Sequence, residues 1–158
     1  MFVPLKITTE YTLLKSTIKI EELISFLKNN NITSCAICDD NLYGIMAFYN
    51  KMINNNLKPV IGLNIKLDNN ELYLYAKNYN GYLNLLKIHT LKEFNELNYE
   101  TINNYLEDIK IVLPLNSYDL VDKYRSAYLG YTCDTEKIEA LLRSENIVYY
   151  KDIKVLNK

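Results

Sequence analysis

Two adjacent carboxylates, Asp39 and Asp40, are the residues of this sequence best suited to hold a divalent cation. They come directly after the apolar run 34–38, which predicts a strand buried on both faces. Carboxylates at a strand end can bind Mg²⁺ or Ca²⁺. Two carboxylates are too few for a catalytic transition-metal site, which normally includes imidazoles. The single histidine, His89, lies beside apolar residues on a predicted helix, so we expect a solvated or core-edge residue there.

Other polar residues also lie near the predicted strand ends, where parallel α/β folds bind ligands. Lys6, Thr8 and Glu10 lie at or just after the end of the first expected strand, and Asn64 lies within the third expected strand. With four glycines in all, the chain has no glycine-rich strand-to-helix turn for phosphate. No serine or cysteine has a recognisable base partner. The residues alone therefore predict no independent active site.

The cysteines allow two interpretations. The spacing Cys35-x-x-Cys38 is that of a redox pair, which normally lies at a helix start. Here the pair falls inside an apolar run, which favours buried, inert thiols. Three cysteines, counting Cys133, are too few for a disulfide scaffold.

Bulk properties indicate an ordinary globular protein. The 158 residues suffice for one domain, with 49% hydrophobic and 23% charged residues. The net charge of −1 gives no support for a free-standing nucleic-acid binder. No apolar run approaches the roughly 18 residues that span a membrane. Residues 1–4 do not resemble a signal peptide, so we expect a cytoplasmic protein.

These side chains must be positioned by alternating strands and helices. Strands are expected over 2–8, 34–39, 59–67, 72–76, 109–113, 128–131, 147–150 and 153–156. Helices are expected over 20–27, 44–55, 82–91, 101–106 and 118–124, and from an N-cap at Asp134, with Ile138, Leu141 and Leu142 at core spacing. Asparagine runs at 29–31 and 54–56 fit helix ends. The alternation predicts one α/β domain over 1–158, with a mostly parallel sheet or an incomplete barrel.

Several segments resemble the PHP (polymerase and histidinol phosphatase) domain family. Residues 5–14, LKITTEYTLL, resemble that family's opening L-H-V-H-T-E-Y-S-L-L, and residues 36–44 resemble A-I-T-D-H-x-N-L-Y-G. Residues 48–49 and 57–62 resemble F-Y followed by I-K-P-I-I-G, and residues 76–87 resemble A-K-N-x-x-G-Y-x-N-L-L-K. Order and spacing hold from about residue 2 to 91, with a weaker similarity to the end.

The resemblance implies that the metal site of the family is degenerate here. Lys6 and Thr8 occupy the positions of a metal-binding His-x-His pair. The family's Asp-His corresponds to Asp39-Asp40, and its Glu ligand corresponds to Asn64. Of these five positions, Asp39 alone keeps its residue type. Because a protonated lysine cannot bind a cation, the resemblance implies no metal ligand set, no catalytic residue and no cofactor in this domain.

The family also implies a biological setting. It includes the domain that begins the alpha subunit of bacterial DNA polymerase III, a DNA-directed DNA polymerase (a nucleotidyltransferase) of DNA replication. We therefore expect a distorted or incomplete (β/α) barrel that is the N-terminal part of a longer polymerase subunit and a non-catalytic scaffold for it. The implied partners are the remainder of the subunit, DNA through that parent protein, and a proofreading exonuclease or other replisome proteins. Mg²⁺ is expected for the parent polymerase.

Two alternatives remain open at this point. The chain could be a metal-dependent phosphoesterase, or a 3'-5' exonuclease-like hydrolase, with a rewired site that uses Asp39, Asp40 and Glu10. It could also be an unrelated ligand-binding α/β module in which the motif match is chance. The strand arrangement separates this last reading from the others, because a PHP domain should form a distorted barrel.

Overall fold

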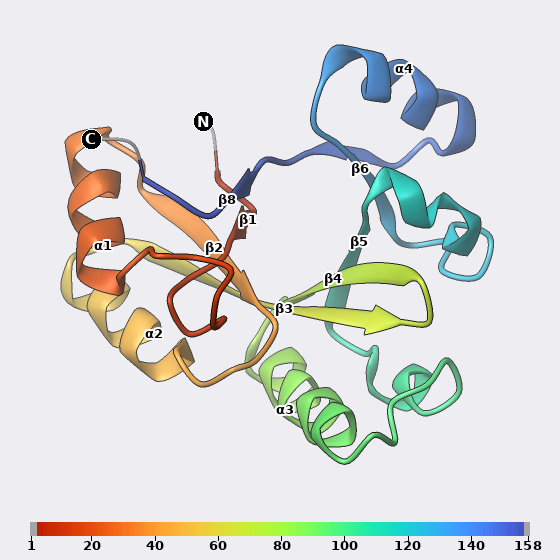
Figure 1. Ribbon diagram of the computed structural model, residues 1–158, viewed down its shortest axis with the longest axis horizontal. Helices are drawn as coiled ribbons and strands as arrows, with labels where there is room; N and C mark the ends of the chain where they lie inside the picture. Colours follow the sequence, from red (N-terminus) through yellow and green to blue (C-terminus); the bar gives the residue numbers. More distant parts are fainter. Residues whose placement is uncertain (1–2, 157–158) are drawn as a thin grey trace.

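Residues 3–156, which the computed structural model describes, form one mixed sheet flanked by helices (Figure 1). Its eight strands lie in the order β7-β6-β5-β4-β3-β2-β1-β8 within this described part. The strands are β1 (Lys6–Ile7), β2 (Ser34–Asp39), β3 (Lys58–Leu67), β4 (Asn70–Ala76), β5 (Ile109–Leu113), β6 (Tyr128–Tyr131), β7 (Ile147–Tyr149) and β8 (Asp152–Ile153). The α-helices are α1 (Ile20–Asn29), α2 (Ile45–Asn54), α3 (Tyr79–Glu93) and α4 (Asp134–Arg143), and two 3₁₀ helices are η1 (Ile102–Tyr105) and η2 (Leu115–Leu120).

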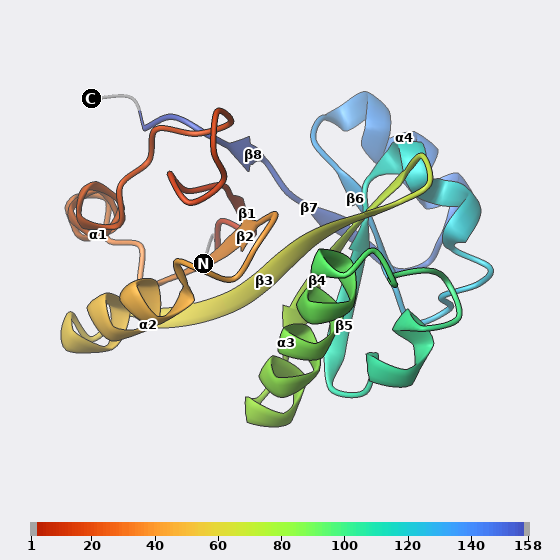
Figure 2. The same ribbon diagram turned by 60° about the horizontal axis from the view of Figure 1, so that its bottom comes forward.

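The sheet curls back on itself. Strands β7 and β8 are its two edges, yet only Tyr150 and Lys151 separate them along the chain. A link of this length spans at most about 11 Å, so the edges approach each other there (Figure 2). The backbone N–H of Tyr150 also donates to the carbonyl of Tyr131 in β6, at 3.0 Å. The expectation of an incomplete barrel is confirmed.

Strand directions follow from the connections. The pairs β1·β2, β2·β3, β5·β6, β6·β7 and β1·β8 are parallel, which confirms a mostly parallel sheet. Strand β4 runs antiparallel to β3 and to β5. The turn before β4 contains Asp68 in the left-handed conformation, with φ of 52°. Tight hairpin turns use such left-handed backbone.

Two apolar clusters lie on opposite faces of this sheet. Along β2, Cys35 and Ile37 pack in the larger cluster with residues of the helices, whereas Ala36 and Cys38 pack in the smaller one. This alternation follows from the two-residue period of a strand. The smaller cluster lies on the concave face and is made by Ala36, Cys38, Tyr73, Tyr75, Val112 and Tyr150. The barrel is therefore filled by aromatic side chains.

Helices α1 and α2 match their predictions. The apolar residues of α1 that recur at helical spacing are buried: Ile20, Leu23, Ile24 and Leu27. Shortly after α1 and α2 end, Asn31 and Asn56 adopt φ of 54° and 57°. Asparagine tolerates this left-handed backbone better than most residues, so the expected role of the asparagine runs is confirmed.

Three other predictions were wrong in part. Helix α4 buries Ala140 and leaves Ile138, Leu141 and Leu142 exposed, so the expected core contact of its apolar residues is not made. Helical spacing shows that such residues share a face, but not that this face meets the sheet. The helices expected over 101–106 and 118–124 are the short 3₁₀ segments η1 and η2.

The first strand is also shorter than expected. Strand β1 spans two residues rather than residues 2–8, and residue 2 lies outside the described range. The backbone nevertheless continues to pair before β1, because the carbonyl of Pro4 accepts a hydrogen bond from the N–H of Ala36 at 2.8 Å. Within residues 3–156, no helix is both long and apolar enough to cross a membrane.

Candidate functional site

The expected ligand positions gather at one end of the barrel, where β1 and β2 end. The parallel register pairs Ile7 with Ile37 and Asp39 with Leu63, which places the ends of β1 and β2 beside the middle of β3. Contacts join Lys6 to Thr8 and Asp40 to Asn64. The resemblance therefore indicated residues that do lie together.

Lys6 places its ammonium group inside the barrel. The residue is 3% exposed, and its Nζ donates to the carbonyl of Cys38 at 2.8 Å and to Thr8 Oγ1 at 3.2 Å. The same ammonium lies 5.0 Å from the ring centroid of Tyr73, within the range of a cation–π interaction. A resident cation is thus built into the chain at this position.

Asp39 is buried and engaged by the segment that follows β1. One carboxylate oxygen accepts from the N–H of Thr9 at 2.7 Å and from Thr12 Oγ1 at 2.8 Å, and the other accepts from Thr9 Oγ1 at 2.6 Å. A buried carboxylate is tolerated only with such compensation. Asp39 therefore fixes the course of this segment.

Asp40 is half-buried between basic and amide groups. Its carboxylate accepts from Lys15 Nζ at 2.5 Å and from Asn64 Nδ2 at 2.8 Å, and its backbone carbonyl accepts from Lys92 Nζ. Burial by itself raises the pKa of Asp40, but the hydrogen bonds from Lys15 and Asn64 outweigh it, so the pKa lies below its ordinary value. The hydrogen bond to Asp40 in turn raises the pKa of Lys15.

These donors do not fit a divalent metal ion. An ammonium group has no lone pair to offer. Asn64 directs its amide nitrogen to Asp40, so its buried Oδ1, which has no hydrogen-bond partner among the described residues, is a single neutral oxygen. Both oxygens of Asp39 already accept hydrogen bonds. Glu10, the third carboxylate of the phosphoesterase alternative, is exposed. Across residues 3–156, no three His, Cys, Asp or Glu side chains group closely enough to hold a metal.

The thiols and the histidine fill structural positions. Burial raises the pKa of Cys35 and of Cys38 to about 12, which confirms the interpretation as inert thiols and not as a redox pair. His89 is 9% exposed, with its Nε2 3.4 Å from Glu93 and its ring edge-on to Tyr43. Burial lowers the pKa of His89, as suits a core-edge residue.

Sequence reasoning missed several residues of the site. Thr12 binds the carboxylate of Asp39, Lys15 binds the carboxylate of Asp40, and Lys92 binds the backbone carbonyl of Asp40, yet none of the three was singled out. Thr12 and Lys15 belong to the segment just after β1, so their proximity to the strand end was a usable signal. Lys92 lies 52 residues from Asp40, and no local pattern connects them.

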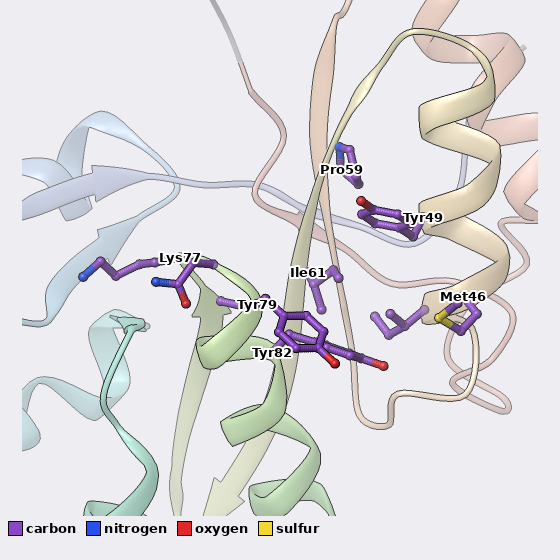
Figure 3. A pocket seen from close by; sticks show the side chains of 10 residues that line it. Met46, Tyr49, Pro59, Ile61, Lys77, Tyr79 and Tyr82 are labelled. Atoms are coloured by element: carbon purple, nitrogen blue, oxygen red, sulfur yellow. The ribbon is translucent and has the colours of Figure 1, made fainter.

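A groove on the outer side of the sheet was also missed. Figure 3 shows it between α2 and α3, over the start of β3, with Met46, Tyr49, Tyr79 and Tyr82 around it. Its volume is about 430 Å³, and it shares no residue with the ligand positions described above. It is therefore a separate surface feature.

Comparison with known proteins decides the family. Residues 4–148 match the family model of the PHP domain. The chain belongs to the PHP domain family. The curled sheet is what this family led us to expect.

The PHP chain is similar to several bacterial proteins named DNA polymerase III subunit alpha. That of Ureaplasma parvum is 43% identical over 99 residues, covering 60% of this chain and 10% of its own length. That of Staphylococcus aureus strain Mu50 is 33% identical over 127 residues, covering 77% of this chain and 10% of the relative. That of Mycoplasma genitalium is 32% identical over 117 residues, covering 72% of this chain and 13% of the relative. The chain thus matches about a tenth of the length of these relatives.

A solved structure is also similar. A putative metal-dependent phosphoesterase from Bifidobacterium adolescentis aligns with a TM-score of 0.43 and 11% sequence identity, over 96% of this chain and 59% of that one.

The role of Asp39 as an anchor leads to a stability prediction. In the Asp39→Asn variant, an amide group that cannot accept replaces one carboxylate oxygen, so at least one buried donor loses its acceptor. We expect the free energy of unfolding to fall by about 1–3 kcal/mol. Urea denaturation measures this change. Asp122→Asn, at an exposed position, is the matched control and should change it by less than about 0.5 kcal/mol. Equal stability of the two variants would contradict the role of Asp39 in holding the segment that follows β1.

The lowered pKa of Asp40 predicts a pH dependence. Because the folded-state pKa lies below the unfolded value of about 3.9, the carboxylate stabilises the fold above that value. This stabilisation is lost as the pH falls through the folded-state pKa. In Asp40→Asn we therefore expect a shallower decrease of the unfolding free energy below about pH 5 than in the wild type. Urea denaturation across this range tests it, with Asp122→Asn expected to follow the wild type. Parallel curves for Asp40→Asn and wild type would rule the prediction out.

Proposed function

We propose that this chain is a non-catalytic PHP domain of a bacterial DNA polymerase III alpha subunit, where it acts as a scaffold during DNA replication. One observation carries the proposal. The buried ammonium of Lys6 lies at the position matched to the first metal-binding histidine of the family, with its hydrogen bonds made to Thr8 and Cys38. The names of the relatives supply the polymerase setting.

Catalysis and structural support then belong to different parts of the subunit. Polymerisation, and the Mg²⁺ that it requires, belong to the remainder of the subunit, which we call the polymerase body. The PHP domain contributes neither metal nor cofactor, and it meets DNA only through the polymerase body. Its direct partner is that body, and a proofreading exonuclease or other replisome protein is a further candidate partner. A cytoplasmic location is part of the same proposal.

The phosphoesterase alternative has weaker support. Its two central carboxylates are both engaged, Asp39 by threonine donors and Asp40 by Lys15 and Asn64. A metal ion would have to displace these hydrogen bonds and also accommodate the ammonium of Lys6 nearby. Coulomb repulsion between the two cations opposes this.

The polymerase setting can be tested in cells that encode the chain. We expect a polypeptide tagged within this domain to purify with DNA polymerase activity on a primed template, because the domain belongs to that enzyme. A tagged polypeptide that purifies without polymerase activity would overturn the proposal.

A second arm of the same experiment addresses the alternative. The 158-residue chain is assayed with bis(p-nitrophenyl) phosphate and millimolar Mn²⁺. We expect the wild type to match Asp39→Ala and also Asp40→Asn, which keeps the hydrogen bonds of Asp39. Hydrolysis that the wild type shows and both variants lack would favour the phosphoesterase.

A further inference from the structure

The segment between β1 and α1 exposes two consecutive leucines at its turn. Leu13 is 82% exposed and Leu14 is 106% exposed. Leu14 also has φ of 62°, in the left-handed region that Gly or Asn adopts more easily. The stability of the isolated domain explains neither property, because a polar residue or glycine would suit this turn better. We call these two residues the leucine tip.

Hydrogen bonds tether the leucine tip on both sides. On its N-terminal side, Thr9 and Thr12 bind the buried carboxylate of Asp39. On its C-terminal side, Lys15 binds Asp40. Ser16 Oγ then donates at 2.6 Å to the carbonyl of Thr8, in the same segment. Apolar side chains presented in a fixed geometry lose little conformational entropy when they bind a partner.

The leucine tip extends into a larger apolar surface. Leu13 lines a hollow together with Tyr11 and Tyr43, and Tyr43 is 66% exposed. Exposed apolar groups that are contiguous, and not scattered singly, mark interaction sites. A leucine pair beside an aromatic ring fits an apolar pocket with a polar rim.

Local charge favours a protein over a lipid surface. Between residues 8 and 18, Lys15 is the one basic residue, and its ammonium is bound to Asp40. Glu10 in the same segment is exposed and acidic. A membrane-inserting segment would normally combine its apolar residues with basic ones that attract anionic headgroups.

We propose that the leucine tip is an anchor that inserts into an apolar pocket on the polymerase body. In the relatives, the matched region is 10–13% of a much longer protein, so a domain of this kind has a large body to contact. The inference rests on the proposed function and deepens it, because it names the surface through which the scaffold makes contact.

Site-directed crosslinking tests the contact. Leu14 is replaced by the photoreactive p-benzoyl-phenylalanine in the complete polymerase subunit, and crosslinked peptides are identified by mass spectrometry. We expect crosslinks from position 14 to peptides of the polymerase body. The control places the same group at Asn69, an exposed residue of the β3–β4 turn, and should not give these peptides. Crosslinks to a second copy or to lipid, or none at all, would overturn the inference.

Failure of this inference is distinguishable from failure of the proposed function. If the tagged chain carries polymerase activity but position 14 does not crosslink to the polymerase body, the leucine tip alone is refuted. If the tagged chain carries no polymerase activity, the proposed function is refuted, and this inference with it.

Substitution of Leu14 separates docking from folding. In Leu14→Asn, the 158-residue chain should keep or raise its Tm, because asparagine tolerates the left-handed backbone and an exposed leucine loses no contact. The complete subunit should instead lose polymerase activity faster on heating. Leu142→Asn, at a position of α4 that is 83% exposed, is the matched control. A lower Tm of the isolated Leu14→Asn chain would refute the docking role of the leucine tip. The same holds if the complete subunit with Leu14→Asn loses activity on heating no faster than the subunit with Leu142→Asn.

Discussion

The end of the barrel where β1 and β2 end depends on the hydrogen bonds to the carboxylate of Asp39. They draw Thr9 and Thr12 onto the end of β2, and this determines where the chain goes after β1. Lys15 is then placed to reach Asp40. A single buried charge thereby fixes both the segment that follows β1 at this end of the barrel and the exposed turn that this segment carries. The carboxylate has a structural use that requires no metal.

Lysine side chains lie beside the acidic residues at the end of the barrel where β1 and β2 end. Lys6 lies within the barrel, while Lys15 and Lys92 bind the carboxylate and the carbonyl of Asp40. In metal-binding relatives of this family, cations from solution would neutralise such carboxylates. Covalently attached ammonium groups do so here. They cannot polarise a substrate or activate water as a bound metal does, and this favours a scaffold over a hydrolase.

Local rules predicted the parts of this fold that local forces determine. Strand β2 was predicted with its observed bounds because both of its faces are apolar, and the left-handed Asn31 and Asn56 follow from helix-end chemistry. The pairing of β1 with β8 joins residues 146 positions apart, from Lys6 to Asp152, and periodicity holds no such information. The resemblance identified the ligand positions by type, but the partners of their side chains, such as Lys92, depend on the tertiary fold. The outward face of α4 went unpredicted for the same reason.

Diffraction from crystals grown with millimolar Mn²⁺ tests the central claim most directly, because anomalous scattering locates the metal. The account predicts no manganese peak within coordination distance of Asp39 or Asp40, and electron density for the Lys6 ammonium in contact with Thr8 and the Cys38 carbonyl. A manganese ion bound by these carboxylates, with Lys6 displaced from the barrel, would contradict it.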